Sequence, residues 1–241
     1  MTQPLVGLER IVESLREPVR NYAEFLRETA GTNARALTLF GSIAAGSYDL
    51  KRHAVRNVFV LDKIDLSMIR RLAEHGVKLG KAHIAAPLIM TPDYIKSSLD
   101  TFPLEFIEIK QQHMTLFGED YFEPLDFDNA HVRLQCERDL KVILIGLRQG
   151  MLAATGREKF INALEAEAGE GLMRTLRGML WLKNQREAKP SGEVVVEIEK
   201  LADCKLPGLR AALDPSAPHG WTAFEKLYYE VEGLGKVVDA W

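Results

Sequence analysis

The stretch Leu37-Thr38-Leu39-Phe40-Gly41-Ser42, followed by Ile43-Ala44-Ala45-Gly46-Ser47, is the most informative part of the chain. Residues 36–40 are predicted to form a short buried strand, and Gly41 and Ser42 come directly after it at a predicted helix start. Such a turn presents free backbone N–H groups, glycine lets a phosphate approach closely, and the serine hydroxyl adds a donor. On chemistry alone, the segment indicates either a phosphate-binding loop or a simple turn with an N-cap.

The sequence around this segment alternates between strand-like and helix-like patterns. Apolar residues at spacings of three and four predict a helix over residues 5–26, interrupted at Pro18 and ended by Gly31. Further strands are predicted at 55–61, 84–90 and 102–110, and helices at 66–79 and from Thr91-Pro92 onward. This alternation predicts a mixed sheet with helices on its face.

The pattern changes after Asp120. Residues 121–129 are acidic and aromatic and contain Pro124, which indicates a linker. From residue 130 onward only helical periodicity is present, in three apolar stripes that include Leu140–Met151, Leu172–Leu180 and Trp221–Val231. The expected fold class is therefore α+β, with a sheet domain over 1–120, a linker over 121–129 and an all-α helical bundle over 130–241.

Phe40-Gly41-Ser42, followed by a small-residue helix start with Gly46 and then a strand, resembles the nucleotidyltransferase superfamily, which shares the DNA polymerase beta fold. The resemblance extends to His113–Asp120, because a turn of this leucine-aromatic-glycine type commonly follows the last sheet strand in bacterial members. It covers roughly residues 32–120. It implies a nucleotidyltransferase-like sheet and a nucleotide ligand held at Gly41 and Ser42.

The resemblance also implies a metal site that this sequence does not match. Active members carry an Asp-x-Asp pair on the strand after the Gly-Ser loop, where both carboxylates face one way and hold two divalent cations. By position, Asn57 and Phe59 replace that pair, and Glu105 or Glu108 would supply the third carboxylate. Asparagine is a neutral, weaker cation ligand and phenylalanine is none. The alternative is that the strand is aligned wrongly.

Two functions follow from this mismatch. In the first, the protein has no metal-dependent transferase activity and no cofactor, and it acts by binding a nucleotide, or a protein partner or second copy through the helical domain. In the second, it is an active enzyme that uses Mg²⁺ to transfer a nucleotidyl group from a nucleoside triphosphate to a small molecule or a protein. A purely structural use of the fold is a third alternative, against which the retained Gly41 and Ser42 speak.

The composition of the chain limits the classes of partner that it can bind. The chain has 241 residues, 31 basic and 34 acidic, with a formal net charge of −3, whereas non-specific nucleic-acid binders normally show a basic excess. Two cysteines are too few for a disulfide framework, and no apolar run is long enough to cross a bilayer. We therefore expect a cytoplasmic protein without a membrane partner. Lys51, Arg52 and His53 form a basic cluster that faces either a phosphate or solvent.

Overall fold

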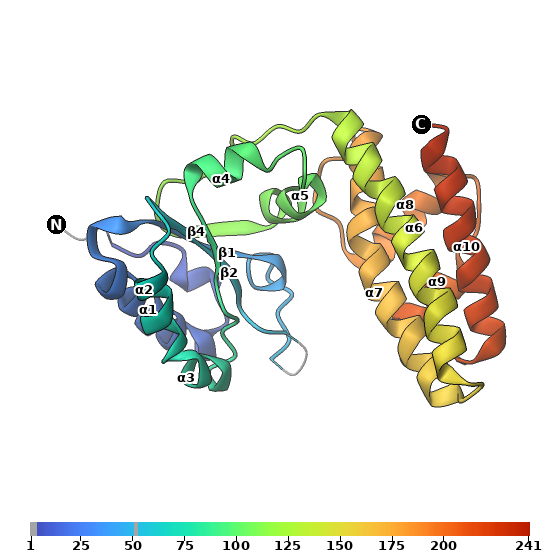
Figure 1. Cartoon of the computed structure of the whole chain (residues 1–241), viewed down its shortest axis with the longest axis horizontal. Helices are drawn as coiled ribbons and strands as arrows, with labels where there is room; N and C mark the ends of the chain where they lie inside the picture. The colour runs from blue at the N-terminus through green and yellow to red at the C-terminus, as the bar shows by residue number, and fades with distance from the viewer. Residues whose placement is uncertain (1–3, 51–52) are drawn as a thin grey trace. The chain divides into compact units, whose positions relative to one another are not determined.

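The computed structural model describes residues 4–50 and 53–241, which form two compact units. The first unit takes in the chain up to Leu99 together with Glu108–Asp126. The second takes in Asp100–Ile107 and Phe127–Trp241. Figure 1 shows a sheet with helices in the first unit and helices alone in the second.

The first unit is built on a four-stranded mixed sheet in the order β3-β2-β1-β4. Its strands are β1 (Ala34–Phe40), β2 (Arg56–Leu61), β3 (Leu88–Met90) and β4 (His113–Gly118). β1 pairs antiparallel with both β2 and β4, and β2 pairs parallel with β3. In this register Thr38 on β1 lies between Val58 on β2 and Thr115 on β4. β1 is thus paired with a strand that comes much later in the sequence.

Three helices lie together on one face of this sheet (Figure 1): α1 (Glu13–Ala30), α2 (Leu66–Ala73) and α3 (Gly76–Lys81). The first two and the sheet bury a common apolar cluster that includes Leu15, Val19, Leu26, Leu37, Leu39, Phe59, Leu61 and Met68. Pro18 lies inside α1, so the predicted interruption does not divide the helix. Gly31 ends it at φ 55°, as predicted.

The expected strand at 102–110 is wrong. Residues Pro103–Gln111 form a helix, α5, and the last strand comes later, at the segment predicted as a turn. Apolar residues at 104, 106, 107 and 109 fit either period, and proline is well tolerated in the first turn of a helix. After this helix the chain returns to the sheet, where β4 pairs with β1 and forms one edge.

Two other elements are shorter than expected. The predicted helix over 66–79 is broken into α2 and α3, and the predicted strand over 84–90 reduces to β3 with an isolated bridge between Val55 and Ile84. The helix start at Thr91-Pro92 is confirmed as α4 (Pro92–Ser97), because the Thr91 side chain accepts a hydrogen bond from the Tyr94 N–H.

β4 ends where only glycine fits. Gly118 has φ 84°, and a Cβ added there would lie 1.9 Å from the carbonyl oxygen of Arg35 on β1. The strands therefore approach each other too closely for any side chain at this point.

The second unit is all helical over its described residues. It holds α6 (Asn129–Ala154), α7 (Glu158–Leu182), α8 (Ser191–Leu201), α9 (Pro207–Leu213) and α10 (Trp221–Asp239). The long helices α6, α7 and α10 run side by side (Figure 1). The expected helical second part is thus confirmed, while a linker confined to 121–129 stays a prediction. Across the described residues, none of the helices combines the length and apolarity that a membrane span requires.

Candidate functional site

The Gly41-Ser42 loop follows β1 as predicted, but it does not open a long helix. Gly41–Ile43 form a single 3₁₀ turn, and Gly41 has φ 76°, a conformation that favours glycine. The Gly41 N–H donates to the carbonyl of Gln112 at 2.8 Å, and the N–H groups of Ala44 and Ala45 donate back to the Gly41 carbonyl at 3.0 Å. Among the hydrogen bonds of the described residues, none involves the half-buried Ser42 hydroxyl.

Arg56, the first residue of β2, lies beside this loop. Its side chain stacks over the ring of Phe40 with 4.3 Å between the guanidinium carbon and the ring centroid. A Cβ added at Gly41 would lie 3.6 Å from the Arg56 Nη1. The guanidinium pairs with both carboxylate oxygens of Glu108 on α5, at 2.5 and 3.3 Å. A bidentate ion pair therefore lies next to the candidate phosphate loop.

The same face of the sheet carries two more polar pairs. In the strand centre, the hydroxyls of Thr38 and Thr115 are 2.9 Å apart. At the start of β4, Nε2 of His113 lies 2.9 Å from the Asp120 carboxylate, which also accepts from the N–H of Phe122. Burial alone would raise the pKa of Asp120, but the bonds from His113 and the backbone outweigh it and hold this pKa below its usual value.

The two predicted metal-site positions are not on this face. Asn57 and Phe59 share one side of β2, as their spacing predicted, but that side packs under α1. Phe59 has 0% of its surface exposed and lies in the apolar cluster. The expectation that it projects beside the Gly41-Ser42 loop is therefore wrong: side chains alternate between the two faces of a strand, and Phe59 lies on the face that α1 covers.

Asn57 has a structural role on that covered side. Its Oδ1 accepts a hydrogen bond from the Tyr22 hydroxyl at 2.9 Å, and its amide donates to the carbonyl oxygens of Ala85 at 3.0 Å and Val55 at 3.3 Å. Both ends of the amide are thus used, as a buried polar group requires. Asn57 is 1% exposed, so its Oδ1 is not open to a cation at the loop.

The two acidic candidates have different surroundings. Glu108 pairs with Arg56, as described above. Glu105 belongs to the second unit, where it pairs with Arg174 at 3.0 Å and accepts from the Gln135 amide at 2.7 Å. Each carboxylate is neutralised by an arginine, which lowers its value as a metal ligand.

The residues at the loop do not fit the pair of cations that the resemblance implies. The side chains that β2 presents beside Gly41 are a guanidinium and, two residues on, the aliphatic Val58, because Arg56 and Val58 oppose Phe40 and Thr38. Neither is a ligand for a hard cation. Within residues 4–50 and 53–241, no group of three or more His, Cys, Asp or Glu is arranged to hold a metal ion.

Sequence reasoning missed Arg56, and the role of the basic cluster stays a prediction. Arg56 is the one charged residue in a strand that is otherwise buried, which is the signal that could have identified it. Of the cluster, Lys51 and Arg52 lie outside the described residues, and the ring of His53 accepts a hydrogen bond from the Asp49 N–H at 3.0 Å.

Comparison with known proteins supports the fold. No protein-family model matches the chain, and no curated protein matches its sequence. Among solved structures, it is similar to the spectinomycin adenyltransferase AAD(9) from Enterococcus faecialis, solved with ATP and spectinomycin. The TM-score is 0.57 at 11% identity, over 92% of this chain and 98% of that one. The predicted nucleotidyltransferase-like fold with a helical second part is confirmed.

Proposed function

We propose that this protein uses a nucleotidyltransferase-like fold to bind a nucleotide at Gly41 and Ser42, without metal-dependent nucleotidyl transfer. The observation that carries the proposal is Arg56 beside the loop. Arg56 and Val58 stand two apart on the loop side of β2, the relation in which active members of the superfamily carry their aspartates. The degenerate pair is thus Arg56 and Val58 rather than Asn57 and Phe59.

The replacement changes the charge that a ligand meets. An aspartate pair repels phosphate unless cations lie between them, whereas a guanidinium binds phosphate oxygens directly through two parallel N–H groups. The Arg56 side chain is about half exposed (48%), so a phosphate can reach it, in exchange for Glu108. The Ser42 hydroxyl supplies a further donor next to it. These groups support binding of a nucleoside triphosphate such as ATP, the ligand of the similar structure.

Calorimetric titration with ATP in EDTA tests the binding. We expect saturable binding without a divalent cation, and a loss of about tenfold or more in affinity for Arg56→Gln, since a charge-assisted bond is removed. The matched control is Arg35→Gln. Arg35 lies at the other end of β1, and the change breaks its exposed ion pair with Asp62. The proposal is wrong if ATP binds only with Mg²⁺, or if both variants lose affinity equally.

A transfer assay separates the two functions. Incubation with labelled nucleoside triphosphates, Mg²⁺ or Mn²⁺ and a cell extract is expected to yield no labelled product. Label that appears and then disappears in Ser42→Ala would establish the alternative, an active nucleotidyltransferase with Mg²⁺ as its cofactor.

The helical unit is the proposed surface for a protein partner or a second copy. Trp221 and Tyr229 on α10 are 54% and 60% exposed, which is unusual for large aromatic side chains and typical of contact surfaces. Light scattering across a concentration series should show self-association that Trp221→Ser weakens. A monomer at all concentrations would exclude the second copy.

A further inference from the structure

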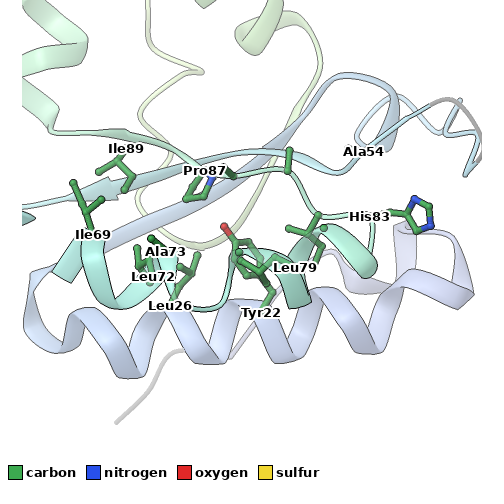
Figure 2. A pocket seen from close by; sticks show the side chains of 15 residues that line it. Tyr22, Leu26, Ala54, Ile69, Leu72, Ala73, Leu79, His83, Pro87 and Ile89 are labelled. Atoms are coloured by element: carbon green, nitrogen blue, oxygen red, sulfur yellow. The ribbon is translucent and has the colours of Figure 1, made fainter. Parts of the chain in front are cut away.

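A cavity lies in the first unit, on the sheet face that the helices cover. It is bounded by α1, α2, α3 and the segment from residue 83 to residue 89, and its volume is about 540 Å³. Figure 2 shows Leu26, Leu72, Leu79 and Ile89 around this space. A cavity of this size is in the range that holds small molecules. The Gly41-Ser42 loop and Arg56 are not among its lining residues.

The walls are almost wholly apolar. Of the fifteen lining residues, all but Tyr22 and His83 are aliphatic, proline or glycine. None of them is an aspartate, glutamate, lysine or arginine. A charged ligand would lose its hydration here without gaining an opposite charge, which is costly. Nucleotides and other anions are therefore poor ligands for this cavity.

Of the two polar side chains that line the cavity, Tyr22 is held in a fixed position by a hydrogen bond. The Tyr22 hydroxyl points toward the segment that holds Pro87 (Figure 2), and it donates its proton to Asn57. Because Asn57 is in turn fixed by the carbonyl of Ala85, the phenol cannot rotate freely. Its oxygen keeps a lone pair that can accept a hydrogen bond. Tyr22 is only 2% exposed and burial raises its pKa, so this hydroxyl stays neutral.

The outer wall leaves room for a ligand to enter. Helix α3 contributes no buried residue, and Val77 on it is 75% exposed. Gly76 and Gly80, four residues apart on α3, both line the cavity, and a Cβ added at either would meet nothing within 4 Å. A wall that makes so few core contacts can open at a small cost in free energy.

We propose that this cavity binds an uncharged, largely apolar small molecule that donates one hydrogen bond to the Tyr22 oxygen. The size selects a small molecule rather than a protein segment, a wall without carboxylates, lysine or arginine disfavours ions, and the oriented hydroxyl selects a donor. The site is separate from the nucleotide site and does not depend on it.

The probe is N-phenyl-1-naphthylamine, which is uncharged and apolar, carries one N–H and fluoresces more strongly in apolar surroundings. We expect saturable binding with one site per chain. The double variant Gly76→Leu/Gly80→Leu should lower the affinity at least tenfold by filling the cavity, and it should fold, because leucine favours helix over glycine. The control is Gly146→Leu/Gly233→Leu in the helical unit, where an added Cβ also meets nothing within 4 Å. It should bind as the wild type does.

A second pair of measurements tests the hydroxyl and does not depend on the glycine variants. Tyr22→Phe should bind N-phenyl-1-naphthylamine about fivefold more weakly, the effect of one neutral hydrogen bond, and should bind 1-phenylnaphthalene, which lacks the N–H, as well as the wild type does. Equal probe binding by both double variants would overturn the proposal. So would exclusion of the probe by concentration-dependent dimerisation, which would mean that a second copy covers the cavity.

Discussion

The two faces of β2 are stabilised by different interactions, although the residues on them alternate along the same strand. On one face, Arg56 is half exposed, stacked on an aromatic ring and paired with Glu108. On the other, Phe59 is fully buried and Asn57 has both ends of its amide bonded. The first face depends on charge and can exchange partners with a ligand. The second depends on burial and cannot change without loss of stability.

The contrast between the two faces of β2 is tested most strongly by the double variant Asn57→Asp/Phe59→Asp. It removes a buried ring, which costs about 3–5 kcal/mol in comparable aromatic losses, and adds carboxylates to an apolar cluster, which costs more. We expect no cooperative thermal unfolding transition at neutral pH. A folded variant whose melting temperature rises with Mn²⁺ would instead place these residues at a metal site.

The next largest effect is expected for Tyr22→Phe. The change leaves the Oδ1 of Asn57 buried without its donor, and an unsatisfied buried acceptor costs about 1–3 kcal/mol. Urea unfolding followed by circular dichroism gives the free energy. Phe25→Leu, at a partly buried position of the same helix, is a useful comparison for general loss of packing on α1. No loss for Tyr22→Phe would mean that the amide finds another partner.

Arg56→Ala should cost less than about 1 kcal/mol in the free energy of unfolding, because exposed ion pairs contribute little. The same urea titration measures it. A loss as large as that for Tyr22→Phe would contradict the contrast between the two faces, since it would make Arg56 a structural residue.

The smallest effect concerns pH. Because the pKa of Asp120 is lowered in the folded protein, its carboxylate stabilises the fold fully above its ordinary pKa and loses that contribution as the pH falls through the lowered value. Asp120→Asn should therefore differ from the wild type at neutral pH and converge with it in acid. The free energies of both proteins from pH 7 down to pH 1, which passes below the ordinary carboxyl pKa and through the lowered one, provide the test. A constant difference would show that Asp120 does not titrate in this range.

The sequence predicted the strands on either side of the Gly41-Ser42 loop and the helical character of the second half, because their hydrophobic patterns are unambiguous. It did not predict α5, since an apolar run after a proline suits both strand and helix. It also placed Asn57 and Phe59 on the wrong face. Both faces of β2 are buried from residue 57 to residue 61, so no polar-apolar alternation marks which side meets the loop. Only Arg56, the exposed residue at the start of the strand, indicates which side meets the loop.

The place of β1 at the centre of the sheet has a consequence for how the chain folds. β1 and β2 are close in sequence, so they can pair early, whereas the contact between Thr38 and Thr115 joins residues 77 apart. Closing so long a loop slows formation of the last pairing. During synthesis, one edge of β1 therefore remains open until β4 has been made, and this edge can pair with another copy before folding is complete.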